Sequence, residues 1–548
     1  MVEAYPLRHF DIAIVGYGPV GATLAGLLGR QGLQVGVFEK SATIFAQPRA
    51  VGFDHDAMRI FQRIGIAQQL GPHIASFRDA EYFGADGQVI QRSRHMAPPY
   101  PFTWSPNYTC DQPGVEAILR QAIGRMANVQ VALEHECIAA REEAERVLID
   151  VRDRHQQQHR YSARYLVACD GASSPVRRML GIELESMEYD EPWIVVDLKV
   201  EPAFLDRLPA TNVQYCEPER PSTFIICPGN HRRWEFMVLD GEPREGALSD
   251  ERLWRLLARW LKPGQASIWR AAAYRFHALI AHDWRRGRMF LAGDSAHQTP
   301  PFLGQGMCQG LRDAGNLAWK LGMAIRGQAG PSLLDTYTEE RRPHVLATTR
   351  IAKELGRMIS ERDPARARAR DAQMLAKGGG MAPTLIRQEM IPGLSQGLIA
   401  AGAPLAGLAF PQPVVATGEG QECLLDDLTG PCFRLVVNSA CDSHALRTLA
   451  AAHGVSVIVL GGVPVTSGKT DDVLQIAERD GLIKAWLDGA GTCGALVRPD
   501  HYVFGAFATV DQALALIDAL AASGLMGEAQ GATQETSDSA PRQAARAI

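Results

Sequence analysis

Residues 10–39, FDIAIVGYGPVGATLAGLLGRQGLQVGVFE, decide the fold. An apolar run ends in the turn GYGPVG, a helical repeat follows, and a second apolar run ends at Glu39. This order of strand, turn, helix and strand is typical of a dinucleotide-binding unit. Gly16, Gly18 and Gly21 permit a tight turn and let a pyrophosphate approach the start of the helix. Because Glu39 stands where a carboxylate can bind a ribose hydroxyl, a cofactor site is favoured over glycines that serve packing alone.

The composition is that of an ordinary globular protein with several domains. The chain has 548 residues, 46% of them hydrophobic and 21% charged, with a formal net charge of -5. A usual domain size of about 100 to 200 residues predicts two to four domains. The charge balance predicts no nucleic-acid partner, and the lack of an apolar run of about 18 residues predicts no membrane span. The N-terminus shows no export pattern, which favours a cytoplasmic protein.

The cysteines argue against two further kinds of site. The chain contains 10 cysteines, and none of them form a C-x-x-C pair. Metal clusters and dithiol redox centres therefore lose their usual sequence support, and we expect neither.

A second glycine-rich motif lies late in the chain. Residues 288–308 read RMFLAGDSAHQTPPFLGQGMC and include Gly293 and Asp294. Asp294 can accept a hydrogen bond from a flavin ribityl hydroxyl, although a helix N-cap or a turn is the structural alternative. Gly304 and Gly306 let backbone amides approach a pyrophosphate or a flavin ring at the start of a helix.

A third motif, VACDGASSPVRR at residues 167–178, contains Asp170 and Arg177. Arg177 on its own reads equally well as a surface cation. Taken in order over roughly residues 10–350, the three motifs resemble those of the flavoprotein aromatic hydroxylases. That resemblance implies a Rossmann-like FAD-binding fold of the para-hydroxybenzoate hydroxylase type, with noncovalently bound FAD. It also implies that the Asp170 region is linked to both FAD and the pyridine nucleotide.

Three more positions match the same family. Arg49 in QPRAVGFDHD resembles an arginine that approaches the flavin, and Gln112 in CDQPGVEAIL resembles a glutamine that contacts the cofactor. Pro301, in the PPFLGQG segment, matches backbone that borders flavin and substrate. A solvated polar residue is the alternative for the first two, and a rigid turn for the proline. The chain has no second G-x-G-x-x-G motif, so NADH or NADPH is expected to dock only transiently.

The motifs and composition shifts divide the chain into an α/β protein with a separate substrate sheet. The expected parts are an FAD-binding domain from 1–80, 105–185 and 285–335, a substrate-binding β-sheet domain from 81–104 and 186–284, a helical connector at 336–400, a thioredoxin-like domain without C-x-x-C at 401–526, and a disordered tail at 527–548.

The segments WIVVDL, YCEPERP and RRWEFMVL resemble the central sheet of the 3-(3-hydroxyphenyl)propionate hydroxylases. The resemblance implies hydroxylation of a small phenolic acid to a catechol through a flavin hydroperoxide, with NAD(P)H and molecular oxygen as co-substrates. Hydroxylation of a larger polycyclic phenol is the alternative, and a flavin-binding protein without turnover is a more distant one. The sequence leaves open the exact substrate, the preference between NADH and NADPH, and the oligomeric state, for which a homodimer is one option.

No catalytic base can be assigned from the sequence. The polar residues that could line a substrate cavity are His231, Tyr215, Tyr108, His277 and Arg275, and each is as readily a core or surface group. The candidates for binding an acidic side chain of the substrate are Arg49, Arg232, Arg233 and Arg275. His297 is expected to serve local structure. Cys308 replaces an asparagine found in many relatives and is expected to serve packing or backbone spacing.

Overall fold

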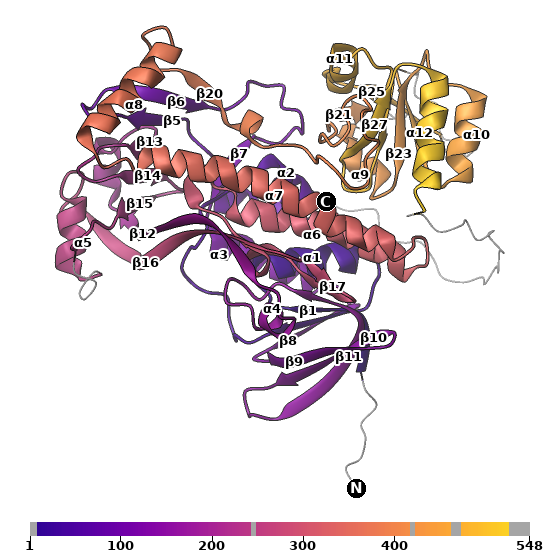
Figure 1. The fold of residues 1–548 in the computed structure, drawn as a ribbon, viewed down its shortest axis with the longest axis horizontal. Helices are drawn as coiled ribbons and strands as arrows, with labels where there is room; N and C mark the ends of the chain where they lie inside the picture. The colour runs from indigo at the N-terminus through magenta and orange to yellow at the C-terminus, as the bar shows by residue number, and fades with distance from the viewer. Residues whose placement is uncertain (1–7, 243–247, 417–421, 462–472, 525–548) are drawn as a thin grey trace.

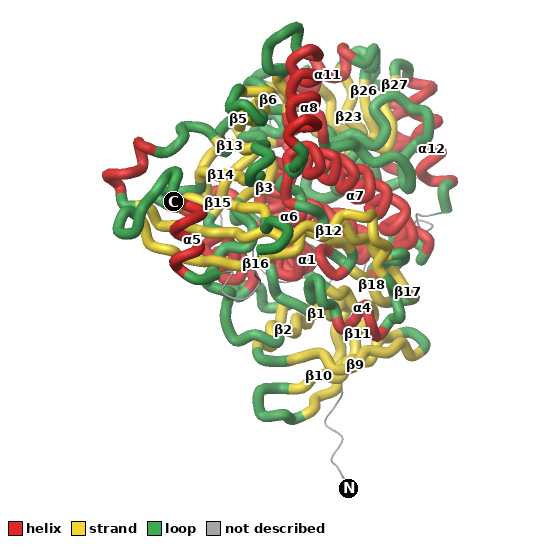
Figure 2. Tube along the Cα trace, turned by 60° about the vertical axis from the view of Figure 1, so that its left-hand side comes forward, coloured by secondary structure: helices red, strands yellow, loops and turns green. Residues whose placement is uncertain are grey.

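The computed structural model describes residues 8–242, 248–416, 422–461 and 473–524 (Figure 1). The tail predicted to be disordered, at 527–548, lies outside these residues. The described chain forms four β-sheets with helices packed against them (Figure 2). This arrangement confirms the predicted α/β class with a separate, more antiparallel sheet. None of the described helices is long and apolar enough to cross a membrane.

The glycine-rich turn belongs to an eight-stranded sheet of order β17-β18-β11-β1-β2-β8, to which β10 and β9 are joined beside β11. β1 (Arg8–Val15) pairs in parallel with β2 (Val35–Glu39) and with β11 (Gln158–Ala168). Its apolar residues are buried in a core shared with α1 (Pro19–Arg30) and α6 (Gly306–Ile325), as expected for a parallel strand between helical layers. The other elements of this part are α2 (His55–Ile64), η1 (Ala67–His73), α3 (Gln112–Ile123), β8 (Val129–Leu133), β9 (Glu136–Glu143), β10 (Arg146–Arg152), α4 (Pro175–Met179), β17 (Arg285–Arg286), β18 (Met289–Leu291), η3 (Gly293–Ser295) and η4 (Pro301–Leu303).

A second sheet of nine strands, which we call the substrate sheet, has the order β19-β16-β12-β15-β14-β13-β5-β6-β20. Its central strands are antiparallel, as their alternating sequence predicts. α5 (Asp250–Leu257) packs on one face, which we call the outer face, and the opposite inner face contacts η4. The strands are β5 (Ala80–Phe83), β6 (Val89–Arg94), β12 (Leu184–Val200), β13 (Asn212–Tyr215), β14 (Ser222–Ile226), β15 (His231–Met237), β16 (Ala266–Ala281), β19 (His297–Gln298) and β20 (Thr384–Ile386), and η2 (Pro202–Arg207) follows β12.

A small three-stranded sheet, β3-β7-β4, lies beside the start of α3. It is built from β3 (Gly52–Asp54), β4 (Ile74–Ser76) and β7 (Asn107–Cys110). The segment expected to be a helical connector contains α7 (Ser332–Ile359), α8 (Pro364–Lys377) and η5 (Arg387–Met390). That segment also supplies β20, which pairs with β6 at the edge of the substrate sheet. α7 lies alongside α6 and crosses the molecule between the substrate sheet and the C-terminal unit (Figure 1).

The C-terminal unit is a mixed seven-stranded sheet of order β22-β21-β25-β24-β23-β26-β27. Two separate apolar clusters lie on its two faces, one containing residues of α10 and α12 and the other residues of α9 and α11. Its elements are β21 (Val414–Ala416), β22 (Glu422–Leu424), α9 (Leu425–Thr429), β23 (Arg434–Asn438), α10 (His444–Ala452), β24 (Ser456–Leu460), β25 (Val473–Glu478), α11 (Leu482–Gly489), β26 (Gly494–Val497), β27 (Val503–Phe507) and α12 (Val510–Ala522).

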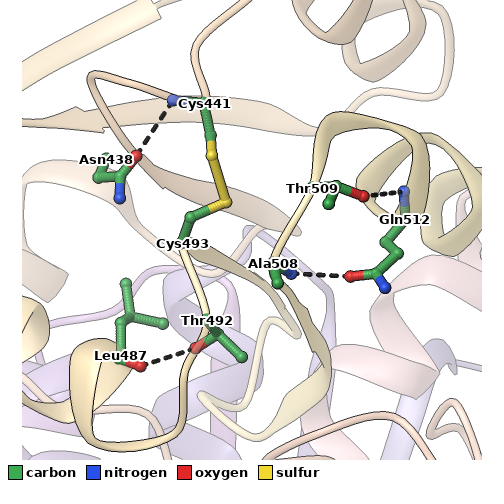
Figure 3. Close-up of a disulfide and its surroundings, with 8 residues drawn as sticks. All are labelled: Asn438, Cys441, Leu487, Thr492, Cys493, Ala508, Thr509 and Gln512. Carbon is green, nitrogen blue, oxygen red and sulfur yellow. Dashed lines mark hydrogen bonds between the residues drawn. A yellow bond between two sulfur atoms is a disulfide. The ribbon is translucent and has the colours of Figure 1, made fainter.

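A disulfide joins Cys441, in the loop after β23, to Cys493, just before β26 (Figure 3). The Cys441 backbone amide donates to the side-chain oxygen of Asn438 at 3.1 Å, and Thr492 donates its hydroxyl to the Leu487 carbonyl at 3.0 Å. The sequence predicts no C-x-x-C pair in this unit, and the disulfide is of another kind, because its two cysteines are far apart in the chain. The two cysteines are 52 residues apart, and only the strand order brings them together, so spacing rules for neighbouring cysteines could not reveal them.

Buried ion pairs hold the C-terminal unit against the rest of the chain. Arg59 on α2 donates to both carboxylate oxygens of Asp426, at 2.5 and 3.1 Å. Arg498 and Lys320 both bind the Glu340 carboxylate at 2.7 Å, and all three side chains are fully buried. The apolar core on the α10 and α12 side also includes Trp319 from α6. This unit is therefore packed onto the N-terminal part rather than joined to it by a linker alone.

Candidate active site

The GYGPVG turn is shaped by positions that exclude side chains. Gly16 has φ +100°, and a Cβ there would collide with the carbonyl oxygen of Cys169. A Cβ at Gly21 would collide with the Gly16 carbonyl. α1 then begins with Gly18 as its N-cap and with no side-chain cap. The first amides of α1 thus keep their donor capacity for an anionic group, as the sequence predicts for a pyrophosphate.

Glu39 lies at the end of β2, directly beside this turn. One of its oxygens accepts from the Tyr17 backbone amide and the other from the Ser41 amide, both at 2.8 Å. These bonds fix the carboxylate next to the start of α1, and each oxygen has a second lone pair for a ribose hydroxyl.

Asp170 follows β11 and lies against the Gly16 turn, where its backbone nitrogen is one of the atoms that a Cβ at Gly16 would meet. One carboxylate oxygen accepts from the Val176 amide at 3.2 Å, while the other is buried without a hydrogen-bond partner among the described residues. Burial raises the pKa of Asp170, although a hydrogen bond from Ser174 partly offsets this. An unpaired buried acceptor beside the turn fits a hydroxyl donor from a bound dinucleotide.

Arg177 is buried and ties two motifs together. It donates to the carbonyl of Ser295, within the GDSAH motif, at 2.8 Å, and to the Ala172 carbonyl at 3.1 Å. Its role in the described structure is therefore to hold the Asp170 loop against the GDSAH segment, and the surface reading does not apply.

Asp294 stands in η3, and we use the word recess for the region that the Gly16 turn, Glu39, Asp170 and Asp294 border. Its side chain is open to solvent although much of the protein surrounds it, as expected for a group inside a recess. This desolvation raises the pKa of Asp294, and the positive fields of His297 and Arg49 partly offset it. Gly293 has φ +64° and packs against Val20 of α1, so the motif reaches the start of that helix.

Asp313 on α6 holds the GDSAH segment in place through hydrogen bonds. The Gly293 amide donates to the Asp313 carboxylate at 3.0 Å, and His297 contacts the same oxygen at 2.7 Å. Arg341 binds the other oxygen at 2.8 Å. His297 thus serves local structure. The sequence analysis did not single out Asp313, because its role depends on the packing of α6 behind the motif.

Gln112 positions the Arg49 segment from one side. Its side-chain carbonyl accepts from the backbone amides of Arg49 and Ala50, at 2.9 and 2.8 Å. Arg233 of β15 binds the same segment from the other side, donating to the carbonyls of Pro48 and Arg49 at 2.9 Å each. The Arg49 guanidinium itself lies over the ring of Phe45.

The PPFLGQG segment closes another side of the recess. Pro301 begins η4, Gly304 follows with φ +62°, and Gly306 begins α6. Gln305, the N-cap of α6, makes no side-chain cap and instead donates to Asp54 at 3.0 Å. A second long helix therefore starts with uncapped amides near the predicted cofactor residues. Burial raises the pKa of the neighbouring Cys308 thiol, which fits packing and not nucleophilic chemistry.

The register of the substrate sheet defines which side chains face this recess. Trp234 and Phe236 of β15 pack in the outer core with α5, so their neighbours Arg233, Glu235 and Met237 point to the inner face. Arg233 confirms this direction by binding the Arg49 segment, and Met237 packs against the inner-face cluster.

Three cross-strand rows can be followed on the inner face. The first row is Ile225, Arg233, Asp197 and Arg270, the second is Tyr82, Gln214, Thr223, Glu235, Val195 and Ala272, and the third is Met237, Trp193 and Tyr274. The first row contacts the Arg49 segment through Arg233, and the third contacts Phe302 beside Pro301 through Trp193, with ring centroids 5.5 Å apart. The second row therefore lies between the two segments that flank the recess.

A cavity of about 480 Å³ lies near the hairpin between β14 and β15. Its lining combines apolar side chains with two arginines. The lining residues are Ala75, Ser76, Phe77, Arg78, Thr109, Ile226, Cys227, Pro228, Gly229 and Arg232.

Comparison with known proteins gives the family. Residues 9–352 match the family described as FAD binding domain, and residues 407–523 match the HcaD C-terminal domain. A probable NADH-specific resorcinol 4-hydroxylase of Rhodococcus jostii (strain RHA1) is 35% identical over 503 residues, covering 91% of this chain and 92% of the relative. A 3-(3-hydroxy-phenyl)propionate/3-hydroxycinnamic acid hydroxylase of Mycobacterium avium (strain 104) is 35% identical over 559 residues, covering 95% and 94%. The chain belongs to the FAD-dependent aromatic hydroxylases.

Solved structures show that the hydroxylase shares its fold along nearly the whole chain. The flavin-dependent monooxygenase PieE, in complex with FAD and substrate, has a TM-score of 0.76 at 21% identity, covering 95% of this chain and 100% of that one. Aklavinone-11 hydroxylase, in a ternary complex with FAD and aklavinone, has a TM-score of 0.71 at 21% identity, covering 94% and 99%.

The substrate-cavity candidates occupy different environments in the hydroxylase. Tyr215 belongs to the outer core, where its hydroxyl accepts from Trp260 at 3.1 Å. Tyr108 accepts from the Ser105 amide at 2.9 Å. Arg275 and His277 lie beside Asp190, with Arg275 in an exposed ion pair at 2.9 Å. None of these four belongs to the three inner-face rows.

His231 and Arg233 lie on the inner face but already have partners. Both bind Asp197, at 2.7 and 2.8 Å, and Arg270 approaches the same carboxylate at 3.4 Å. Burial alone would raise the pKa of Asp197, but the neighbouring Arg233 and His231 hold it at about 2. The residues of the second row, Glu235 among them, were not found by sequence reasoning, because only strand register places them together.

Proposed function

We propose that this hydroxylase binds FAD in the recess, takes its reducing equivalents from NADH, and uses molecular oxygen to convert a small phenolic acid to a catechol. The observation that carries the proposal is the second row of the inner face. This row holds polar groups between the Arg49 segment and the PPFLGQG loop, and we propose that both of these segments border the cofactor. The named activities of the two curated relatives, on resorcinol and on hydroxyphenylpropionate, support the phenolic class.

The proposed FAD contacts follow from the geometry of the recess. Bound FAD supplies the redox chemistry, because its reduced form activates oxygen as an electrophile. The residues proposed to hold it are Gly16, Gly18, Gly21, Glu39, Arg49, Asp170, Gly293, Asp294, Pro301, Gly304 and Gly306. Gln112 acts through the backbone of the Arg49 segment. None of these residues is proposed to bond covalently to the cofactor.

The chain itself must position the ring and keep water away from it. Trp193, Phe276 and Phe302 pack together, with ring centroids 5.5 to 5.9 Å apart. Such an apolar cluster, which includes Trp193 of the third row, excludes water beside the second row and so favours hydroxylation over loss of reducing equivalents as hydrogen peroxide.

The arginine-lined cavity supports an acidic substrate. Its volume of about 480 Å³ lies in the range of small-molecule sites, and Arg78 and Arg232 give it positive charge. Arg233 is committed to Asp197, and Arg275 to Asp190. Arg232 lines this cavity at the hairpin end of β15, where its Nη1 atom donates to the carbonyls of Cys227, Gly229 and His231, and we favour its remaining N–H groups as the partner for a substrate carboxylate.

The test is a comparison of substrates with product formation measured together with NADH loss. We expect 3-(3-hydroxyphenyl)propionate to be hydroxylated with good coupling, its methyl ester to have a higher KM, and phenylpropionate to give no product. Product from a bulky polycyclic phenol alone would favour the larger-substrate alternative. NADH oxidation that no phenol stimulates would support a flavin-binding protein without turnover.

A variant pair tests the acid-binding part separately. We expect Arg232→Gln to raise KM for the phenolic acid about tenfold or more and to leave the methyl ester nearly unchanged, since one charge-assisted contact is lost. Arg275→Gln is the matched control and should behave like the unchanged enzyme. If Arg232→Gln changed KM equally for the acid and for the ester, Arg232 would not be the residue that binds the substrate carboxylate.

A further inference from the structure

The Glu235 side chain is largely buried, and its carboxylate makes no hydrogen bond within the part of the chain that the structure describes. It is 6% exposed and lies on the inner face in the middle of the second row. Its one ion-pair contact among the described residues is with Arg233, at 4.0 Å, which exceeds hydrogen-bonding distance. Buried carboxylates are costly unless hydrogen-bonded, so an unpaired one in this position points to a ligand that donates to it.

The residues nearest to Glu235 on the sheet direct their polar groups elsewhere. Thr223, directly opposite on β14, donates its hydroxyl to the side-chain oxygen of Gln214 at 2.7 Å and so gives nothing to Glu235. Val195, opposite on β12, has no polar side-chain atom. Arg233, two residues before it, directs its guanidinium to Asp197 and the Arg49 segment. The free acceptor therefore stands beside the segment that borders the proposed cofactor site.

We propose that Glu235 accepts the proton of the substrate's ring hydroxyl, an inference that rests on the proposed hydroxylase function. The phenolic O–H bond breaks, its proton passes to a carboxylate oxygen of Glu235, and the electron pair stays on the phenolic oxygen. That pair raises the electron density at the ring carbons ortho and para to the oxygen, where an electrophilic oxygen is attacked. Proton transfer by a positioned side chain contributes typically about 10² to 10⁴ in rate.

The charges around Glu235 suit this task. Burial raises its pKa, the nearby Asp197 raises it further, and Arg233 and Arg270 oppose them. Tyr82, at the far end of the same row, stays protonated because burial raises its pKa to about 12. A carboxyl group with a raised pKa is a better proton acceptor for a weakly acidic phenol than an ordinary surface carboxylate.

The first test compares Glu235→Gln and Glu235→Asp with the unchanged holoenzyme. For Glu235→Gln we expect kcat to fall about 100-fold or more at neutral pH, with FAD still bound. We expect the unchanged enzyme to show an acid limb of kcat/KM above the ordinary carboxylate range, because burial raises the pKa of Glu235, and we expect Glu235→Gln to lose that limb. Glu235→Asp should keep that limb at a lower rate, because a carboxylate remains. A limb due to the substrate's own carboxyl group would persist in every variant.

The second test needs no turnover. Oxidised holoenzyme without NADH is titrated with 3-(3-hydroxyphenyl)propionate and with phenylpropionate, and the flavin absorbance is followed. We expect the unchanged enzyme to prefer the hydroxylated ligand about tenfold or more, and Glu235→Gln to lose much of that preference, because a neutral acceptor forms a weaker bond. Glu217 lies away from this face and is paired with Arg259, so Glu217→Gln is the control. This control variant should keep the preference for the hydroxylated ligand.

The outcomes separate this inference from the proposed function. If the unchanged enzyme hydroxylated no phenol, both the proposed function and the role of Glu235 would be contradicted. If Glu235→Gln hydroxylated the substrate with unaltered kcat, pH profile and ligand preference, only the assignment of Glu235 would be contradicted. A Glu235→Asp variant that loses the acid limb while it still binds FAD would also overturn the assignment, and would leave Glu235 as a charge partner for Arg233.

Discussion

Arg233 links Glu235 to Arg49: its Nη1 atom lies 4.0 Å from a Glu235 carboxylate oxygen and donates to the Arg49 carbonyl at 2.9 Å. The same guanidinium is fixed by Asp197 through two bonds of 2.8 and 2.9 Å. One side chain therefore sets the spacing between the inner face of the substrate sheet and the segment that borders the proposed flavin site. We therefore expect the distance between substrate and cofactor to depend on this connection.

Replacing Arg233 by lysine should uncouple the reaction. Lysine has one ammonium group and lacks the planar fork that binds Asp197 and two carbonyls together. We expect the product formed per NADH to fall at least twofold and hydrogen peroxide to rise accordingly, because the Arg49 segment is held less firmly. The measurement is product against NADH and peroxide. Arg275 forms an exposed ion pair with Asp190, so Arg275→Lys is the control. It should keep the product formed per NADH of the unchanged enzyme.

Asp294→Ala should weaken FAD binding. The loss of one charge-assisted hydrogen bond, typically worth about 1.5 to 3 kcal/mol, corresponds to a Kd roughly 10- to 150-fold higher. Equilibrium dialysis or flavin fluorescence of the purified protein measures this change. The apoprotein should keep its circular dichroism spectrum, because Asp294 is open to solvent. A variant with full FAD occupancy and unchanged activity would refute the contact.

Asp170→Asn provides an independent check of the same cradle. The replacement keeps the shape but removes the charge from the buried oxygen that has no partner in the described structure. We expect a smaller loss of FAD affinity than for Asp294→Ala, since an amide oxygen still accepts a hydroxyl donor. An unchanged Kd would mean that this oxygen does not contact the cofactor.

Glu340→Gln should destabilise the fold by about 3 to 5 kcal/mol, because it leaves Lys320 and Arg498 buried with less compensating charge. Burial alone would raise the Glu340 pKa, but Arg498 and Lys320 hold it at about 2, below its ordinary value of 4.5. The stabilisation is therefore complete above about pH 4.5 and is lost as the pH falls toward 2. Urea unfolding gives the free energy of unfolding of the unchanged enzyme and of Glu340→Gln. The difference between the two values should be smaller at pH 4 than at pH 7.

The matched control for that variant is Glu251→Gln, whose exposed pair with Arg255 contributes at most about 1 kcal/mol. A Glu340 variant as stable as this control would show that the charge cluster does not hold the C-terminal unit in place.

Reduction of the Cys441–Cys493 disulfide should lower the stability of the C-terminal unit without affecting hydroxylation. A loop of 52 residues gives an upper bound of about 4 kcal/mol on the chain-entropy model. The Cys441→Ser variant should therefore unfold at lower urea concentration, with kcat unchanged. Cys423→Ser, a free cysteine in the same unit, is the control. Loss of hydroxylation in Cys441→Ser with FAD retained would reveal a role for the disulfide in catalysis.

The sequence by itself determined the nucleotide-binding fold and the motifs of the cradle. Residues 10–39 do so because strand and helix periodicity, a glycine turn and a terminal carboxylate are all local features, readable at fixed spacing. The alternating segments likewise predicted an antiparallel substrate sheet. Asp294 and the glycines could be nominated for the same reason, since each belongs to a contiguous motif.

Only the tertiary structure decided how the rest of the site is assembled. Glu235 and Thr223 are on different strands, and the register that places them opposite each other depends on the whole sheet. Nothing in the local sequence distinguishes Arg233 from other arginines, and its role follows from its contacts with residues 48 and 49. Cys441 and Cys493 are brought together only by the order of the strands. Pairing across a sheet joins residues far apart in the chain, and its energy comes from packing that no local pattern records.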